Sequence, residues 1–291
     1  MQIALGFLWL LDGALQLQPF MLRASFARQV LDPSSDGQPH FVAGPAHWAA
    51  NLIAAHPVVW DIPFATTQLL LGIGMLFPRT ARLALFASVP YALGVWFFGE
   101  GLSGLASGNA SLLSGAPGAV LLYAVIALAA RPRNGRSDLP AAAWLRGAWA
   151  TAWIGAALLQ ALPKNNDGAD VASAMLANGS PSWLSRFETS SGVWTSRHGA
   201  LVVMTLVAVE AVIGLTILYD RTLTLGVAAG FAGALAIWIL TQNLGALYTG
   251  QATDPNTAPL IALMALALLG GVRRPLRVAR ARPHRTTAAT S

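Results

Sequence analysis

Trp9, Asp12, Gln16 and Pro19 occupy an otherwise apolar segment near the start of the chain. Their spacings of three and four residues place them on one face of a predicted helix. An ionisable side chain inside a membrane costs at least about 2.5 kcal/mol, so it usually faces other helices and has a function. Asp12 could accept a proton or bind a ligand headgroup beside Trp9 and Gln16. It could also hydrogen-bond to a neighbouring helix as structural glue.

Two glutamates are further candidates for proton chemistry. Glu210 lies in the middle of a long apolar segment, where it could carry a proton or hydrogen-bond across helices. Glu100 ends another apolar segment and precedes a stretch of small and hydroxyl-bearing residues. That stretch could cradle a small polar ligand or a quinone oxygen, or it could be a helix end with glycine turns.

His56 and His198 stand at matching places, each at the start of an apolar segment. If they met, they could ligate a haem or a metal. Asp61, one helical turn from His56, could then orient its ring. They could equally be polar helix starts at the membrane interface. Haem-binding bundles usually place such histidines deeper, so we expect no metal site and keep haem only as a testable alternative.

Composition indicates a membrane protein. Residues are 55% hydrophobic and only 10% charged, with a mean hydropathy of +0.56, whereas a soluble domain has about 25% charged residues. The net charge of +6 does not indicate nucleic-acid binding, because the basic residues are dispersed between apolar segments. There is no cysteine, which excludes disulfides and thiolate-bound metal or iron–sulfur centres within the chain.

Eight apolar segments are candidates for membrane-spanning helices. They lie near residues 3–22, 58–77, 82–100, 116–131, 144–162, 198–218, 222–243 and 257–272. This layout places most of the basic residues on the side that holds both termini, which predicts that both termini are cytoplasmic in an inner (plasma) membrane. Membrane lipid is therefore the expected surrounding partner. The outer connections 23–57 and 163–197 contain amphipathic stretches at 21–31 and 180–187.

The chain also repeats itself. At a constant offset, Trp96 matches Trp238, His56 matches His198, and Gly108 matches Gly250. We therefore predict an all-α membrane protein with eight transmembrane helices, arranged as two tandem parallel four-helix repeats at 1–135 and 143–272. Residues 273–291 are predicted to be a basic, disordered cytoplasmic tail. Four spans per repeat give both repeats the same orientation.

The turn after the third segment carries a family resemblance. Gly99-Glu100-Gly101, Gly104 and Ser107-Gly108, with a weaker echo at Asn243, Gly245 and Thr249-Gly250, resemble the DoxX/DoxD-like integral membrane family. That family is similar to the DoxD subunit of thiosulfate:quinone oxidoreductase. The resemblance implies a four-helix bundle per unit and proximity to membrane quinone. This chain departs from the family in being duplicated and in lacking the Gly-Glu-Gly core in its second repeat.

The sequence thus predicts an inner-membrane subunit of a quinone-linked redox system with a redox partner at the outer face. Asp12, Glu100 and Glu210 would handle protons, and Trp9 and Trp96 would stack on the quinone ring. Whether the chain is itself catalytic stays open. Two alternatives remain: a small-solute transporter or channel, and a non-catalytic membrane scaffold.

Overall fold

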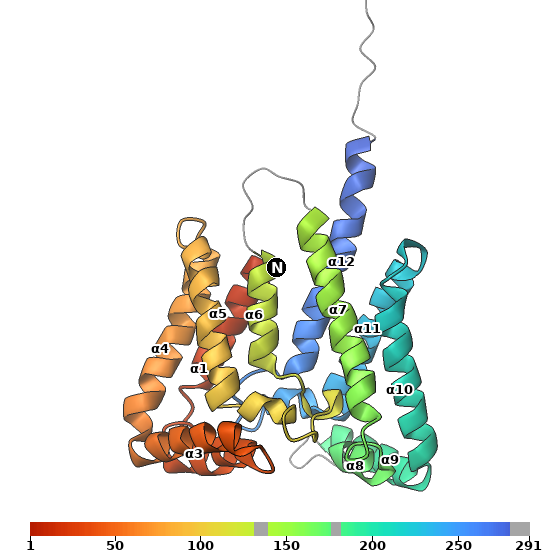
Figure 1. Ribbon diagram of the computed structural model, residues 1–291. Coiled ribbons are helices and arrows are strands. Elements are labelled where there is room, and N and C mark those ends of the chain that lie inside the picture. Colours follow the sequence, from red (N-terminus) through yellow and green to blue (C-terminus); the bar gives the residue numbers. More distant parts are fainter. Residues whose placement is uncertain (131–138, 176–181, 280–291) are drawn as a thin grey trace, which may run out of the picture.

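The computed structural model describes residues 1–130, 139–175 and 182–279, and every regular element within these ranges is a helix. Figure 1 shows upright helices standing side by side, with α3, α8 and α9 lying across one end. The N-terminus and the C-terminal end of α12 lie at the other end (Figure 1). The tail predicted from residue 273 lies partly in α12, and residues 280–291 fall outside the described part of the chain.

In the first half of the chain, α1 packs along α4, and α5 packs along α4 and α6. Short helical turns and α3 connect α1 to α4 at the end away from the N-terminus. The elements are α1 (Gln2–Leu15), α2 (Ala24–Phe26), the π-helix η1 (Ala27–Leu31), the 3-10 helix η2 (Asp32–Ser35), α3 (His40–Ala55), α4 (Pro57–Leu76), α5 (Ala81–Phe98), η3 (Gly101–Gly104), η4 (Leu112–Ser114) and α6 (Ala119–Ala130).

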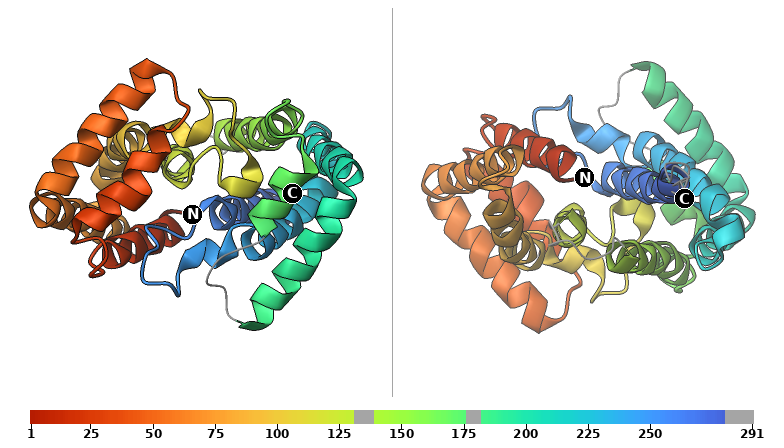
Figure 2. Two further views of the ribbon diagram at one scale, coloured as in Figure 1. Left: turned by 90° about the horizontal axis from the view of Figure 1, so that it is seen from below. Right: turned by 90° about the horizontal axis from the view of Figure 1, so that it is seen from above.

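In the second half, α7 packs along α10, and α11 packs along α10 and α12. The elements are α7 (Leu139–Gln160), α8 (Gly168–Met175), α9 (Ser182–Arg197), α10 (Gly199–Thr216), α11 (Asp220–Leu240), η5 (Asn243–Ala246) and α12 (Thr257–Ala279). Figure 2 shows the two groups of helices on opposite sides of the molecule, with α6 and α12 meeting between them.

Within the described residues, four helices are long and apolar enough to cross a membrane, namely α4, α5, α10 and α11. Only 22% to 33% of the residues in their apolar windows are buried inside the protein. Large side chains such as Leu70, Leu83 and Leu225 are exposed on these helices, which is the pattern of a surface covered by lipid. Shorter apolar helices are Gln2–Leu15, Ala119–Ala130 and Thr257–Leu269. These features support a membrane protein.

Every predicted span overlaps a helix, but the first is shorter than expected. The predicted segment 3–22 becomes α1, which ends at Leu15. Pro19 lacks a backbone donor and disfavours helical geometry at the residue before it, so the chain turns here. The predicted amphipathic stretch 21–31 forms α2 and η1. Part of the stretch 180–187 forms the start of α9, and its first two residues fall outside the described part of the chain.

Two loops cross between the halves. The first loop, residues 99–118, contacts the second half: Ser111 Oγ donates to Gln160 Oε1 (3.0 Å), and Asn165 Nδ2 donates to the carbonyl oxygen of Ala110 (2.9 Å). The second loop, residues 241–256, contacts the first half, where Gln18 Nε2 donates to the carbonyl oxygen of Ala252 (3.4 Å). The loops therefore tie each half to the other.

The two loops share a local shape. Each begins with residues in the left-handed region, at Leu102 and Ser103 (φ 56° and 51°) and at Leu244 (φ 54°). In each, a tryptophan of the preceding helix donates its indole N–H to a proline carbonyl. Trp96 Nε1 lies 2.7 Å from Pro117 O, and Trp238 Nε1 lies 2.9 Å from Pro255 O.

We expect Gly72→Ala to destabilise the protein, because α1 and α4 approach closely at this residue. A Cβ atom at Gly72 would lie 2.7 Å from Leu10 Cγ and 2.8 Å from the carbonyl oxygen of Gly6. Overpacking of this kind costs about 1–3 kcal/mol. The matched control is Gly155→Ala in α7, where a Cβ atom meets nothing within 4 Å. Thermal melts in detergent should show a lower Tm for Gly72→Ala alone, and equal Tm values would contradict this packing.

Candidate functional site

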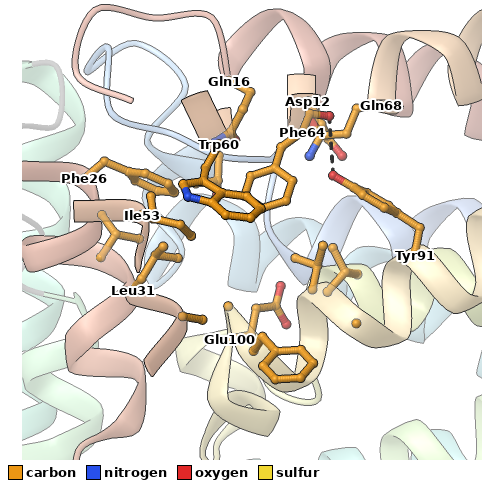
Figure 3. A pocket seen from close by; sticks show the side chains of 18 of the residues that line it. Asp12, Gln16, Phe26, Leu31, Ile53, Trp60, Phe64, Gln68, Tyr91 and Glu100 are labelled. Carbon is orange, nitrogen blue, oxygen red and sulfur yellow. Dashed lines mark hydrogen bonds between the residues drawn. The ribbon is translucent and has the colours of Figure 1, made fainter. Parts of the chain in front are cut away.

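A cavity of about 420 Å³ lies inside the first half (Figure 3). Its walls come from α3, α4, α5 and the segment of α2 and η1, and most of them are apolar or aromatic. The aromatic lining residues are Phe26, Trp48, Trp60, Phe64, Tyr91 and Phe98. No described lining residue is lysine, arginine or histidine. Val30, Trp48 and Phe98 are also exposed on the molecular surface, so they mark its mouth.

One polar cluster in this cavity consists of Asp12, Gln68 and Tyr91. Figure 3 shows their polar ends pointing toward one another from α1, α4 and α5. Asp12 and Gln68 are only 2% and 8% exposed, and Asp12 Oδ1 and Gln68 Oε1 have no hydrogen-bond partner in the protein. Buried polar atoms are normally paired, so this cluster fits a ligand that supplies the missing partners.

Gln16 and Asp61 support the wall beside this cluster. The Gln16 side-chain amide donates to Asp61 Oδ1, and both residues are buried. This bond ties the end of α1 to the first turns of α4. Asp61 therefore holds Gln16, and does not orient His56 as the sequence suggested.

Glu100 forms a second polar position, separate from the first in Figure 3. It follows the last residue of α5, and its carboxyl points into the cavity. Ser103 Oγ donates to Glu100 Oε2 (2.9 Å), and the backbone N–H of Val120 at the start of α6 also donates to the carboxyl. Gly118 leaves room for this arrangement, since a Cβ atom there would lie 2.2 Å from Glu100 Oε2. Burial, together with the charge of Asp254, raises the pKa of Glu100 to about 8.

The second half contributes two residues to the same cavity. Thr253 and Asp254 of the second loop line it. Asp254 Oδ1 accepts from the backbone N–H of Asn256 (2.7 Å), and Asp254 Oδ2 accepts from Thr253 Oγ1 (2.7 Å). Burial raises the pKa of Asp254, and these two hydrogen bonds act in the opposite direction. The cavity is thus built from both halves of the chain.

The predicted aromatic partners lie outside the cavity lining. Trp9 is fully buried and packs edge-on against Tyr91 and Tyr123, with ring centroids 5.6 and 4.6 Å apart. The indole N–H of Trp96 donates a hydrogen bond to the carbonyl oxygen of Pro117. Both tryptophans therefore lie outside the cavity. Trp60 and Phe64 are among the aromatic side chains that line it in Figure 3.

The structure does not bring His56 and His198 together. His56 joins α3 to α4 and His198 joins α9 to α10, and these junctions lie on opposite sides of the molecule (Figures 1 and 2). His198 instead stacks on Trp194 (4.5 Å between centroids) and donates from Nδ1 to its carbonyl oxygen (2.9 Å). Within the described residues, no group of three or more His, Cys, Asp or Glu side chains could hold a metal ion.

Glu210 is also separate from Asp12 and Glu100. It lies on α10 in the second half, is 2% exposed, and neither carboxyl oxygen has a hydrogen-bond partner in the protein. It does not line the cavity of the first half. The predicted acidic set therefore divides into a pair that shares a cavity and one residue that does not.

Ser35, His47 and Asp32 form a separate cluster that superficially resembles a hydrolytic triad. Ser35 Oγ lies 3.2 Å from His47 Nε2, and His47 Nδ1 lies 2.6 Å from Asp32 Oδ1. The Ser35 hydroxyl donates to the carbonyl oxygen of Asp32 (2.6 Å), and Ser35 is only 2% exposed. A buried, engaged hydroxyl is not placed to attack a substrate, so this cluster fastens α3 to η2.

Sequence reasoning missed Tyr91, Thr253, Asp254 and Trp60 as cavity residues. Tyr91 and Trp60 looked like ordinary residues of apolar segments. A polar Thr-Asp pair in the second loop was a visible signal, but only the crossing of the loops places it beside Glu100.

No family model, curated protein or solved structure matches the chain.

We expect Glu100→Gln to make the stability of the protein less dependent on pH. The pKa of Glu100 is about 8 in the folded protein against an ordinary value of 4.5, so the folded state binds the proton more tightly than the unfolded chain. Wild-type protein should therefore lose stability as pH rises from about 5 to 8, with no further loss from this group above that range. Glutamine keeps the acceptor oxygen but does not ionise.

The measurement is Tm from pH 5 to 9 for wild type and Glu100→Gln in detergent. The Tm of the variant minus the Tm of wild type should increase as pH rises to about 8, and it should stay constant at higher pH. Asp36→Asn, at an exposed carboxyl, is the control and should show a constant difference. A pH-independent difference for Glu100→Gln would show that Glu100 does not hold its proton in this way.

Proposed function

We propose that the protein crosses the membrane eight times, as two tandem parallel four-helix units at residues 1–135 and 143–272. The matching sequence positions, the similar packing of α1 with α4 and α7 with α10, and the shared loop shape support this arrangement. The short helix α1 would cross with help from the turns that follow it.

We propose an inner (plasma) membrane location with both termini in the cytoplasm. The α4–α5 and α10–α11 turns lie at the same end as the N-terminus in Figure 1, and they carry or adjoin Arg79, Arg82 and Arg221. Basic residues concentrate on the cytoplasmic side of membrane proteins. α3 and α9 would then lie at the outer interface, where Trp48, Trp183 and Trp194 are exposed.

The ligand that fits the first-half cavity best is a lipid-soluble quinone. The observation that carries this proposal is a cavity with aromatic and apolar walls in which two buried polar atoms lack partners. Asp12 Oδ1 donates to a quinone carbonyl when the carboxyl is neutral, and Gln68 Oε1 accepts from the hydroxyl of the reduced quinol. Neutral carboxyl groups and the Gln68 amide can each donate a hydrogen bond to a quinone carbonyl, whereas the Tyr91 hydroxyl donates to the carbonyl oxygen of Phe64 (3.4 Å). Trp60 and Phe64 offer ring faces for stacking. The exposed lining residues Val30, Trp48 and Phe98 would let a membrane-dissolved ligand enter sideways.

We further propose that the chain serves as a DoxX/DoxD-like membrane subunit of a quinone-linked redox system. Its side chains would bind the quinone head, exclude water and supply protons at Asp12 and Glu100. Electrons would come from a partner protein docked at the outer face, near the lateral helices α3 and α9. The family resemblance of the Gly99-Glu100-Gly101 turn supports this assignment.

One observation favours a transporter as the second candidate. Asp12, Glu100 and Asp254 line the cavity together without a basic side chain, which suits a small organic cation among aromatic rings. The scaffold alternative is weaker, because a scaffold needs no enclosed polar cavity.

We expect purified protein to bind a short-tailed ubiquinone, and Asp12→Leu and Gln68→Leu to weaken that binding. The loss of one hydrogen bond, about 1–1.4 kcal/mol, corresponds to about 5- to 10-fold in Kd. Quenching of tryptophan fluorescence measures the affinity, because Trp60 and Trp48 line the cavity. Glu210→Gln, at the place in the second half that matches Gln68, is the control and should bind as wild type does.

Mass analysis of the lipid extract and an optical spectrum complete this experiment. Retained quinone that is lost from Asp12→Leu would support the proposal. A Soret band, or saturable binding of an organic cation in place of quinone, would contradict it.

A further inference from the structure

The Glu100 carboxyl is held so that it can present a proton to the cavity. Ser103 fixes one of its oxygens, Gly118 gives it room, and Figure 3 shows the group pointing inward. A neutral Glu100 can donate a hydrogen bond, whereas an ionised Glu100 can only accept one. Whether this residue suits a carbonyl oxygen therefore depends on its remaining protonated.

Asp254 is the charged neighbour that sets this state. Both of its oxygens accept hydrogen bonds from its own loop, at 2.7 Å from Asn256 N and 2.7 Å from Thr253 Oγ1. Such bonds favour the ionised form of a carboxyl. Among the described residues, Asp12 on α1 and Tyr123 on α6 are the other titratable groups that interact with Glu100, Tyr91 on α5 lines the same cavity, and none of these is basic. Glu100 accepts a matching pair from Ser103 and the backbone N–H of Val120, so the order of ionisation follows the ordinary pKa, which is lower for aspartate than for glutamate.

We propose that Asp254, supplied by the second half, is a positioning residue that keeps Glu100 protonated for hydrogen bonding to a carbonyl oxygen of the quinone head. Two neighbouring carboxyl groups in an enclosed site cannot both ionise cheaply, so a charge on Asp254 retains the proton on Glu100. This inference rests on the proposed function. The Asp12, Gln68 and Tyr91 cluster stands apart from Glu100 and serves the second carbonyl of a para-quinone.

Titration of short-tailed ubiquinone binding from pH 6 to 9.5 tests the inference. Wild-type affinity should hold up to about pH 8 and then fall, because ionised Glu100 no longer donates. In Asp254→Asn the neighbouring charge is gone, so the fall should begin at lower pH. Its Kd should equal that of wild type at pH 6 and be at least about threefold higher at pH 8.

Two further variants keep the test decisive. Asp254→Glu retains the charge and should restore the wild-type profile. Thr253→Val removes one bond to Asp254 without changing side-chain volume much. It should move the profile in the same direction by less, and it decides the matter if Asp254→Asn does not fold.

Superimposable pH profiles for wild type, Asp254→Asn and Thr253→Val would overturn the inference and leave the proposed function standing. A uniform loss of affinity at every pH would overturn it too, because that outcome reports a merely structural role. Absence of quinone binding by wild type at any pH would overturn the proposed function, and the inference with it.

Discussion

The hydrogen bonds of the two crossing loops are the interactions on which the rest of the structure depends. Loops that leave their helices inside an apolar protein carry backbone carbonyls that need donors. Side chains of the opposite half supply them: Gln242 Nε2 donates to Leu112 O (3.0 Å), Thr241 Oγ1 donates to Leu113 O (2.9 Å), and Lys164 Nζ donates to Ser107 O (2.8 Å). Neither half satisfies its loop alone, so the halves fold onto each other and the cavity receives Asp254.

The second half differs from the first at positions that match cavity residues. At the places where the first half has Asp12, Tyr91 and Glu100, the second has Ala156, Gly233 and Gln242. A Cβ atom at Gly233 would lie 3.2 Å from the ring of Trp153, so this tryptophan occupies the corresponding space. The side-chain oxygen of Gln242 accepts a hydrogen bond from the backbone N–H of Ala258 (3.1 Å) at the start of α12. The second half contributes Thr253 and Asp254 of its loop to the cavity of the first half.

The positions of most of the long helices could be predicted from the length of the apolar segments, because a helix that crosses a membrane needs about 20 mostly apolar residues. Asp12, Gln16 and Glu100 were identifiable as polar residues in or beside such runs. Asp254 was not assigned to the site, since its role depends on a contact with residues far away in the chain. Trp9 and Trp96 were predicted to stack on a quinone ring, but neither lines the cavity, because sequence spacing does not distinguish the ring that lines a cavity from the ring that packs behind it. The lateral helix α3 was read only as a connection.

The most direct test of this account is a cross-link between the second loop and the turn that follows α1. The chain lacks cysteine, so Gln18→Cys and Ala252→Cys introduce a single pair where Gln18 Nε2 and Ala252 O now lie 3.4 Å apart. A protease site inserted between α6 and α7 then allows the halves to be separated after treatment with a short thiol-reactive cross-linker. The account predicts that the two fragments of one molecule stay covalently joined. Fragments that separate, or that join only between different molecules, would contradict the crossing of the loops and the shared site built on it.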